Sequence, residues 1–153
     1  MDFGGRYLFR AKRDAVWAAL NDTRVLQAVI PGCEKIAWTG PDTLELSVRV
    51  SLGLVHPVFA GGLVLSDVHP AEHYVLSGHG RGMLGLAQAS ARIALDDAPD
   101  GTVLSFAADG SADGGIMRLG RTLIGRSAQK LIDGFFESIG REMGAIVTAL
   151  PPD

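Results

Sequence analysis

Two histidines and a carboxylate stand close together in the segment His69-Pro70-Ala71-Glu72-His73. Imidazole and carboxylate groups are common ligands of zinc, and histidines four residues apart meet on one face of a helix. Pro70 and the strand-like residues on both sides favour a hairpin turn instead. We therefore expect a solvated turn at this point and no metal site.

Cys33 is the single cysteine, so it forms no disulfide within the chain. A catalytic thiol needs a neighbouring base, and no histidine lies next to Cys33 in the sequence. His56 or His79 remains a partner that folding could bring close. Most lone cysteines are small buried apolar residues, and this is the interpretation we favour for Cys33.

The segment Gly80-Arg81-Gly82-Met83-Leu84-Gly85 matches the G-x-G-x-x-G pattern of dinucleotide-binding sites. Those glycines bind a pyrophosphate when they join a strand to a helix inside a βαβ unit. Here strand-like segments surround the motif and no second βαβ unit follows, so we expect no dinucleotide site. With no other catalytic pattern in the chain, we expect a protein that is not an enzyme.

Four basic residues gather where the last helix is predicted to begin: Arg118, Arg121, Arg126 and Lys130. Cations near a helix N-terminus oppose the helix dipole. An ordinary solvated face is one interpretation of this cluster. A contact with an anionic partner, either lipid head groups or an acidic protein surface, is the other.

The composition is unusually apolar for a soluble chain of 153 residues, with 47% hydrophobic and 20% charged residues. Its mean hydropathy is +0.22. No run reaches the roughly 18 apolar residues of a membrane-spanning helix, and the N-terminal residues lack the features of a secretory signal. We expect a cytoplasmic protein. The net charge of -3 argues against a nucleic-acid partner.

The hydrophobic pattern predicts the elements that must position any site. A strand at 6–10 precedes two short helices, the first capped by Asp14 and the second ending at Ile30-Pro31. Alternating residues then predict strands at 34–39, 44–50, 58–68, 72–81, 84–96 and 102–113. A helical period extends from about Gly115 to Leu150. We expect one ligand-binding domain at 1–150 and a short tail at 151–153.

These elements predict an α+β fold of the helix-grip type, in which a curved seven-stranded antiparallel sheet wraps around a long C-terminal helix. The residues expected to face that helix include many small ones: Gly61, Gly78, Gly80, Ala87, Ala89, Ala91, Ala108 and Gly110. Small side chains permit either close contact between helix and sheet or an empty pocket. The apolar excess favours the pocket, for which we expect this lining: Trp38, Val48, Val50, Phe59, Leu63, Tyr74, Met83, Met117, Leu123 and Phe135.

Several segments together form a recognisable pattern: Ile30-Pro31-Gly32-Cys33-Glu34, Phe59-Ala60-Gly61, Gly78-His79-Gly80, Gly114-Gly115-Ile116-Met117-Arg118-Leu119-Gly120-Arg121 and Phe135-Phe136. In these segments, which span nearly the whole chain, the sequence resembles the carbon monoxide dehydrogenase CoxG family. That family belongs to the START-like, or SRPBCC, superfamily of helix-grip ligand binders.

The resemblance implies a non-catalytic accessory protein of a molybdenum hydroxylase of the carbon monoxide dehydrogenase type. Such a protein would carry an apolar ligand, such as a quinone, or recruit the enzyme to the membrane, without a covalently bound cofactor. Many members continue into a proline-rich linker and an apolar anchor. Because this chain ends at Asp153, we expect a soluble shuttle or adaptor with at most peripheral membrane contact.

Two alternatives stay open. The same fold serves enzymes such as cyclases and hydrolases of aromatic or polyketide substrates. An enzyme of this kind would use His79, Tyr74 or Cys33 as acid or base inside the pocket. The other alternative is an assembly factor whose interior is filled by its own side chains.

Overall fold

The computed structural model describes residues 2–49, 54, 56–82, 85–112 and 121–151, without the side chains of 112, 121–125 and 127. Within these residues the chain forms strands and helices in this order: β1 (Asp2–Phe9), α1 (Arg13–Leu20), α2 (Thr23–Val29), β2 (Cys33–Trp38), β3 (Thr43–Arg49), β4 (Val58–His69), β5 (His73–Gly82), β6 (Gly85–Ala98), β7 (Gly101–Ala112), α3 (Arg121–Met143) and β8 (Val147–Leu150).

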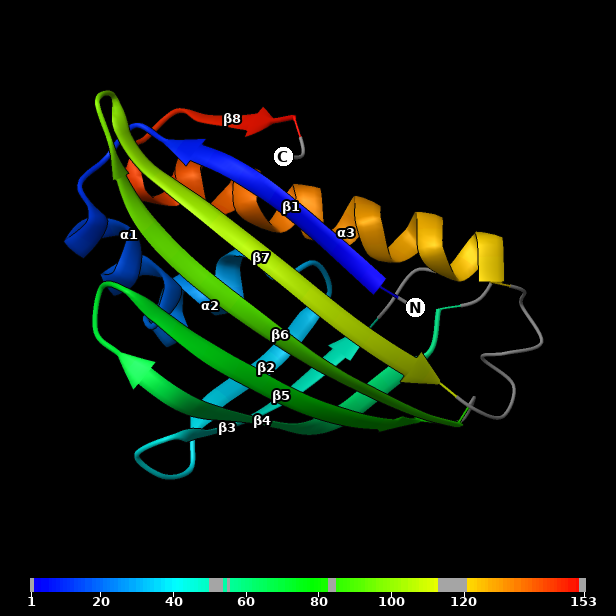
Figure 1. The fold of residues 1–153 in the computed structure, drawn as a ribbon. Helices are drawn as coiled ribbons and strands as arrows, with labels where there is room; N and C mark the ends of the chain where they lie inside the picture. Colours follow the sequence, from blue (N-terminus) through cyan, green and yellow to red (C-terminus); the bar gives the residue numbers. More distant parts are fainter. Residues whose placement is uncertain (1, 50–53, 55, 83–84, 113–120, 152–153) are drawn as a thin grey trace.

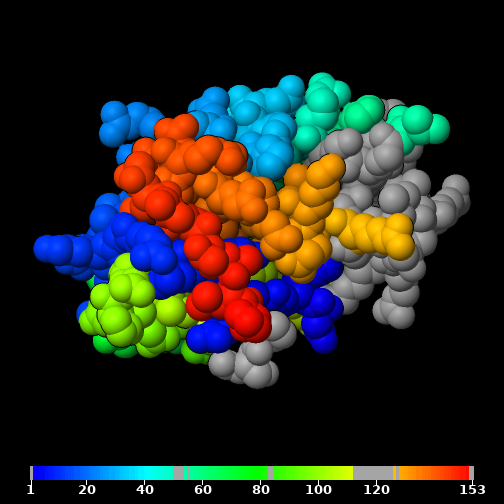
Figure 2. All heavy atoms as spheres, turned by 90° about the horizontal axis from the view of Figure 1, so that it is seen from above, coloured from blue at the N-terminus to red at the C-terminus, as the bar shows by residue number. Residues whose placement is uncertain are grey.

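The strands form one open sheet in the order β2-β3-β4-β5-β6-β7-β1-β8, and neighbouring strands are antiparallel. The sheet curves strongly, and α3 lies across its concave face while α1 and α2 fill one end (Figure 1). Viewed from above, α3 lies between β8 on one side and the segment of α2, β2 and β3 on the other (Figure 2). The predicted helix-grip architecture is confirmed.

The two short helices after β1 bury one apolar side each. In α1, Val16 and Leu20 are buried, and in α2, Leu26 and Val29 are buried. Asp22 caps α2 by accepting a hydrogen bond of 2.9 Å from the backbone N–H of Arg24. That bond lowers the pKa of the Asp22 carboxyl.

The predicted cap of α1 by Asp14 is wrong. The N-cap position is Lys12, which makes no side-chain capping bond, and Asp14 lies inside the first turn. An acidic residue there still interacts favourably with the positive end of the helix dipole. The sequence pattern therefore located the helix start to within two residues but misassigned the role of the carboxylate.

The C-terminal helix ends earlier than the predicted Leu150. Gly144 has a left-handed backbone angle, φ +70°, which ends α3 after Met143. The backbone N–H of Ala145 then donates to the Gly140 carbonyl at 2.8 Å, as in a helix-terminating turn. Residues Val147–Leu150 pair with β1 and add an eighth strand to the predicted seven. Their apolar spacing fits a helical period only by coincidence.

The register of the sheet separates a filled half of the concave face from an open half. Tyr74, Ile93 and Phe106 pair across β5, β6 and β7, and all of them are buried. The same row positions farther along these strands hold Gly78, Ala89 and Gly110, because side chains alternate with a period of two residues. Ala89 is exposed. The predicted inward set of small residues therefore shares the concave face with the core.

An aromatic cluster anchors α3 to the filled half. The ring of Phe136 lies 4.6 Å from that of Tyr7 and 5.4 Å from that of Phe106. The Tyr7 hydroxyl donates a hydrogen bond of 2.6 Å to Asp133 Oδ1, and the Gln129 amide donates to the same oxygen at 3.0 Å. These contacts determine where the helix crosses the sheet and therefore where space remains beneath it.

Candidate functional site

The candidate site is a cavity of about 130 Å³ between α2, α3 and the concave face of the sheet. Helices supply part of its wall and five strands supply the rest. Its lining consists of Leu20, Asn21, Leu26, Ile30, Ile36, Leu44, Leu63, Leu65, Tyr74, Leu76, Ile93 and Phe135. Ten of these twelve residues are apolar, so the cavity offers a water-poor environment to whatever enters it.

The two polar residues of the lining are Tyr74 and Asn21. Tyr74 is only 4% exposed, and burial raises the pKa of its hydroxyl far above the ordinary value. The hydroxyl therefore stays protonated and remains a hydrogen-bond donor. Within the part of the chain that the structure describes, it has no hydrogen-bond partner.

Neighbouring residues hold these polar groups in place. The Trp17 ring meets the Tyr74 ring edge to face, with 5.2 Å between ring centroids. The Asn21 amide nitrogen donates to the Trp17 carbonyl at 2.9 Å, which leaves the amide oxygen as an acceptor. The end of α1 thus positions both polar residues of the cavity.

The cavity has the size of one ring rather than of a whole extended ligand. A cavity of roughly 150 Å³ holds benzene, whereas pockets for drug-sized molecules measure about 300–1,000 Å³. Leu63 and Leu76 connect the cavity wall to the open half of the concave face, since Leu63 pairs with Gly78 across β4 and β5. A longer apolar ligand could extend from the cavity along this half.

Two glycines of the open half make room for side chains of β4. A Cβ atom at Gly78 would lie 2.6 Å from Leu63 Cδ2, and one at Gly80 would lie 3.5 Å from Phe59 Cβ. These side chains cover part of the surface that the glycines leave free. The small residues thus serve close packing at β4 and β5, while the partly exposed alanines of β6 remain uncovered.

The structure brings three of the ten predicted pocket residues to the cavity, namely Leu63, Tyr74 and Phe135. Three more lie on strands outside its lining: Trp38, which is 38% exposed, and the half-buried Val48 and Phe59. Val50, Met83 and Met117 lie outside the described residues, and so does the side chain of Leu123.

Sequence reasoning missed the part of the lining that comes from the short helices and the turn after them: Leu20, Asn21, Leu26 and Ile30. Their apolar spacing marks them as helix positions that face a core. That signal does not distinguish a residue that packs against protein from one that borders a cavity.

The residues proposed for enzymatic chemistry are not brought together. Burial raises the pKa of the Cys33 thiol, which donates to the Lys35 carbonyl at 3.5 Å. A nucleophilic cysteine needs the opposite shift. His79 is exposed and alternates with Gly78 and Gly80, which places it on the outer face of the sheet.

The glycine motif of residues 80–85 spans the end of β5 and the start of β6. It joins two strands, whereas a dinucleotide site requires a strand followed by a helix. The expectation that it binds no dinucleotide agrees with this geometry.

Of the four basic residues, Arg118 lies outside the described residues and Arg121 is described by its backbone alone. Arg126 and Lys130 are exposed on α3, one helical turn apart, and no acidic residue stands in the first turn of that helix. Among the helices described, none is long and apolar enough to span a membrane.

Solved structures show the same fold. A conserved protein from Geobacillus kaustophilus is 24% identical, covering 96% of this chain and 99% of its own, with a TM-score of 0.87. The Zhui aromatase/cyclase from Streptomyces sp. R1128 is 12% identical over 94% of this chain and 93% of its own (TM-score 0.67). Ara h 8.0201 is 15% identical over 94% and 97% (TM-score 0.65).

Searches of curated proteins find no match to this chain. The sequence profile of the carbon monoxide dehydrogenase CoxG family matches residues 5–144, which include the sheet from β1 to β7, all three helices and the entire lining of the cavity. With this match and the helix-grip architecture together, the chain belongs to the CoxG family.

Proposed function

We propose that this protein is a non-catalytic accessory protein that binds the ring of an apolar ligand, such as a quinone, in the cavity beneath α3. The observation that carries the proposal is the lining: ten apolar residues with one buried hydroxyl that lacks a partner in the described chain. A buried polar group without a partner is costly, and a ligand with a carbonyl oxygen would remove that cost.

The polar groups fit a quinone in number and in kind. A quinone ring is flat and apolar apart from its carbonyl oxygens, which only accept hydrogen bonds. The Tyr74 hydroxyl is a donor of the required type, and Leu63, Leu65 and Phe135 offer apolar surface for the ring. An apolar tail would follow the small residues of the open half of the sheet.

The absence of an acid and base pair from the described lining favours an accessory role over catalysis. General acid–base chemistry needs a group whose pKa lies near the working pH, in reach of the substrate. The raised pKa of Tyr74 is far from that range. A cyclase or hydrolase of the same fold is the alternative that the experiment below must exclude.

The family name points to a carbon monoxide dehydrogenase as partner, and we include a molybdenum hydroxylase of this type in the proposal. Exposed Arg126 and Lys130 supply a basic surface on α3 for an acidic patch of the enzyme or for anionic lipid head groups. The chain would then move a redox-active ligand between an apolar phase and the enzyme, in the cytoplasm or at the inner face of the membrane.

Fluorescence of Trp17 tests ligand binding directly. The chain has two tryptophans, and only Trp17 contacts a residue of the cavity wall. In the variant Trp38→Phe, we expect menadione, a naphthoquinone without a tail, to quench the remaining fluorescence in a saturable manner. The same quinone with a short isoprenoid tail should bind more tightly because it buries more apolar area.

Two further substitutions provide the control in the Trp38→Phe background. Leu76→Phe fills the cavity and should weaken quenching, whereas Val64→Phe adds the same ring on the outer face, where Val64 is 45% exposed. Equal quenching in both variants, or none in the parent, would contradict the carrier proposal. Chemical turnover of a ligand by the isolated protein would instead establish the enzyme.

A further inference from the structure

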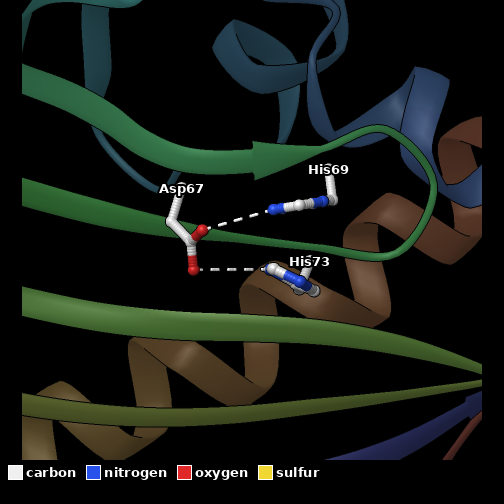
Figure 3. A group of neighbouring side chains, drawn as sticks. All are labelled: Asp67, His69 and His73. Carbon is white, nitrogen blue, oxygen red and sulfur yellow. Dashed lines mark ion pairs between the residues drawn. The ribbon is translucent and has the colours of Figure 1, made fainter.

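A carboxylate and two imidazoles meet on the outer face of the β4–β5 hairpin, away from the cavity. The side chains of Asp67, His69 and His73 point toward one another (Figure 3), and one ligand atom from each lies within 4.8 Å of the others. His69 Nε2 is 3.3 Å from Asp67 Oδ1, and His73 Nδ1 is 3.7 Å from Asp67 Oδ2.

A β-bulge creates this arrangement. Ser66 pairs with Val75 and His69 pairs with His73, so Asp67 and Val68 on β4 oppose Tyr74 alone on β5. Without the extra residue, His69 would continue the concave face that Leu65 occupies, by the two-residue period. The bulge turns His69 outward into register with His73. Two histidines four positions apart therefore meet across a hairpin rather than along a helix.

The turn that closes the hairpin is tight. The Glu72 backbone N–H donates to the His69 carbonyl at 2.9 Å, and Ala71 has φ +62°. Proline at the second position and a positive φ at the third are features of a type II turn, and here Pro70 precedes Ala71. Asp67 also has a positive φ, +48°, a conformation that aspartate tolerates better than most residues. The backbone thus holds the carboxylate against both rings.

The spacing suits a metal ion better than it suits direct hydrogen bonds. In a tetrahedral zinc site with bonds of about 2.0–2.1 Å, neighbouring ligand atoms are about 3.3 Å apart. The 3.3 Å separation matches this value and the 3.7 Å separation lies close to it. By contrast, 3.7 Å is too long for a hydrogen bond between an imidazole and a carboxylate.

His73 supplies a second observation that points to a ligand. Its Nδ1 atom is buried and has no hydrogen-bond partner among the described residues, although the side chain as a whole is 33% exposed. Buried nitrogen atoms of this kind are rare in proteins and call for a bonding partner. The His69 and His73 rings lie 4.3 Å apart, so a single ion can contact both.

We propose that Asp67, His69 and His73 bind a divalent first-row transition-metal ion, with Zn²⁺ as the natural probe. Two imidazoles and a carboxylate are ligands that this class of ion prefers over Mg²⁺ or Ca²⁺. The exposed Asp67 and His69 leave room for water to complete the coordination. The ion would join the two strands of the hairpin beside Tyr74, whose side chain lines the cavity on the opposite face.

Arg92 makes a prediction specific to this site. Its Nη1 lies 3.9 Å from Asp67 Oδ2, and its side chain is 64% exposed. A guanidinium next to the carboxylate competes with a metal cation for the same oxygen. Removing Arg92 should therefore increase metal affinity, the opposite of the effect of removing a ligand.

Titration calorimetry with ZnCl₂ on the metal-free full chain tests the proposal. We expect a stoichiometry of about one ion per chain and a rise in the unfolding temperature that a chelator reverses. Asp67→Asn, His69→Asn and His73→Asn should each lower the affinity more than about tenfold. Asparagine is chosen at position 67 because it tolerates a positive φ. Arg92→Ala should raise the affinity.

His79→Asn is the matched control, since it removes an exposed histidine from the outer face of the same strand. It should leave zinc binding unchanged, and circular dichroism should show all variants folded. The proposal is overturned if the wild-type chain binds no zinc, or if His79→Asn weakens binding as much as His69→Asn does. Neither outcome bears on the carrier function, because the apolar cavity is measured separately by quinone binding.

Discussion

The two tyrosines of this protein are both buried, but they differ in what their hydroxyls contact. The Tyr7 hydroxyl donates to Asp133, and this bond ties β1 to α3. The Tyr74 hydroxyl borders the cavity and has no partner within the described residues. At the scale of single residues, one tyrosine thus serves the fold and the other is available to a ligand.

The pair Tyr74→Phe and Tyr7→Phe should separate these roles. Loss of one neutral hydrogen bond is worth about 0.5–1.5 kcal/mol, so Tyr74→Phe should weaken menadione binding roughly twofold to tenfold without lowering stability. Tyr7→Phe should lower the free energy of unfolding by about 1–2 kcal/mol and leave binding unchanged. Tryptophan quenching and urea unfolding measure the two effects, and equal effects of both variants would refute the distinction.

Alkaline titration should show both tyrosines as non-ionising in the folded protein. Burial raises both pKa values, and for Tyr7 the hydrogen bond to Asp133 adds to the shift. The stability contributed by the neutral hydroxyls is therefore fully present below about pH 10, the ordinary tyrosine value, and is lost as the pH rises above it. Phenolate absorbance should appear only together with unfolding; a tyrosine that ionises earlier in the folded state would contradict this.

At the scale of elements, the glycines of α3 have different surroundings. A Cβ atom at Gly140 would lie within overlap distance of Val147 on β8, whereas one at Gly134 would have no atom within 4 Å. The two explanations for helix glycine, close packing and open space, thus both occur in one helix. Gly140 permits the contact between α3 and β8, and Gly134 leaves free volume on the helix surface.

Substitution by alanine should distinguish these two glycines. Gly134→Ala should raise the free energy of unfolding by about 0.5–1 kcal/mol because alanine has the higher helix propensity. Gly140→Ala should lower it by about 1–3 kcal/mol because the added methyl group forces β8 or the end of α3 to move. Urea unfolding measures both. A stabilising Gly140→Ala would show that β8 is not packed against the helix as the structure has it.

At the scale of the whole molecule, the sheet is filled at one end and open at the other. The aromatic cluster around Phe136 and the short helices α1 and α2 close the filled end, and the cavity lies at its border. A ligand that enters the cavity would extend the core of the folded protein. Ligand binding and folding are therefore thermodynamically linked.

A quinone at about one hundred times its dissociation constant should stabilise the folded state by about 2.7 kcal/mol. For a chain of this size, that corresponds to a rise in unfolding temperature of roughly 5–10 °C. Differential scanning calorimetry measures the shift, which Leu76→Phe should reduce. If the zinc and quinone sites are independent, their stabilising effects should add; a large departure from additivity would show coupling through the hairpin that carries Tyr74.

The sequence by itself determined the order of the elements, the curved antiparallel sheet and the small residues on its concave face, because these follow from local periodicity. Strands such as Thr43–Arg49 alternate apolar and polar residues, and Asp22 marks the start of a helix. Such patterns depend only on near neighbours along the chain. Family membership followed from the same residues.

Only the tertiary structure decided where the helix ends, which residues border the cavity and which polar groups meet. Gly144 ends α3 because the following residues gain strand pairing with β1, a contact between the two ends of the chain. Leu20 and Ile30 reach the cavity because α1 and α2 pack over the sheet. Asp67 joins His69 and His73 because a bulge shifts the register of β4 against β5. Each of these depends on distances between segments far apart or on a one-residue offset, which periodicity along one strand does not encode.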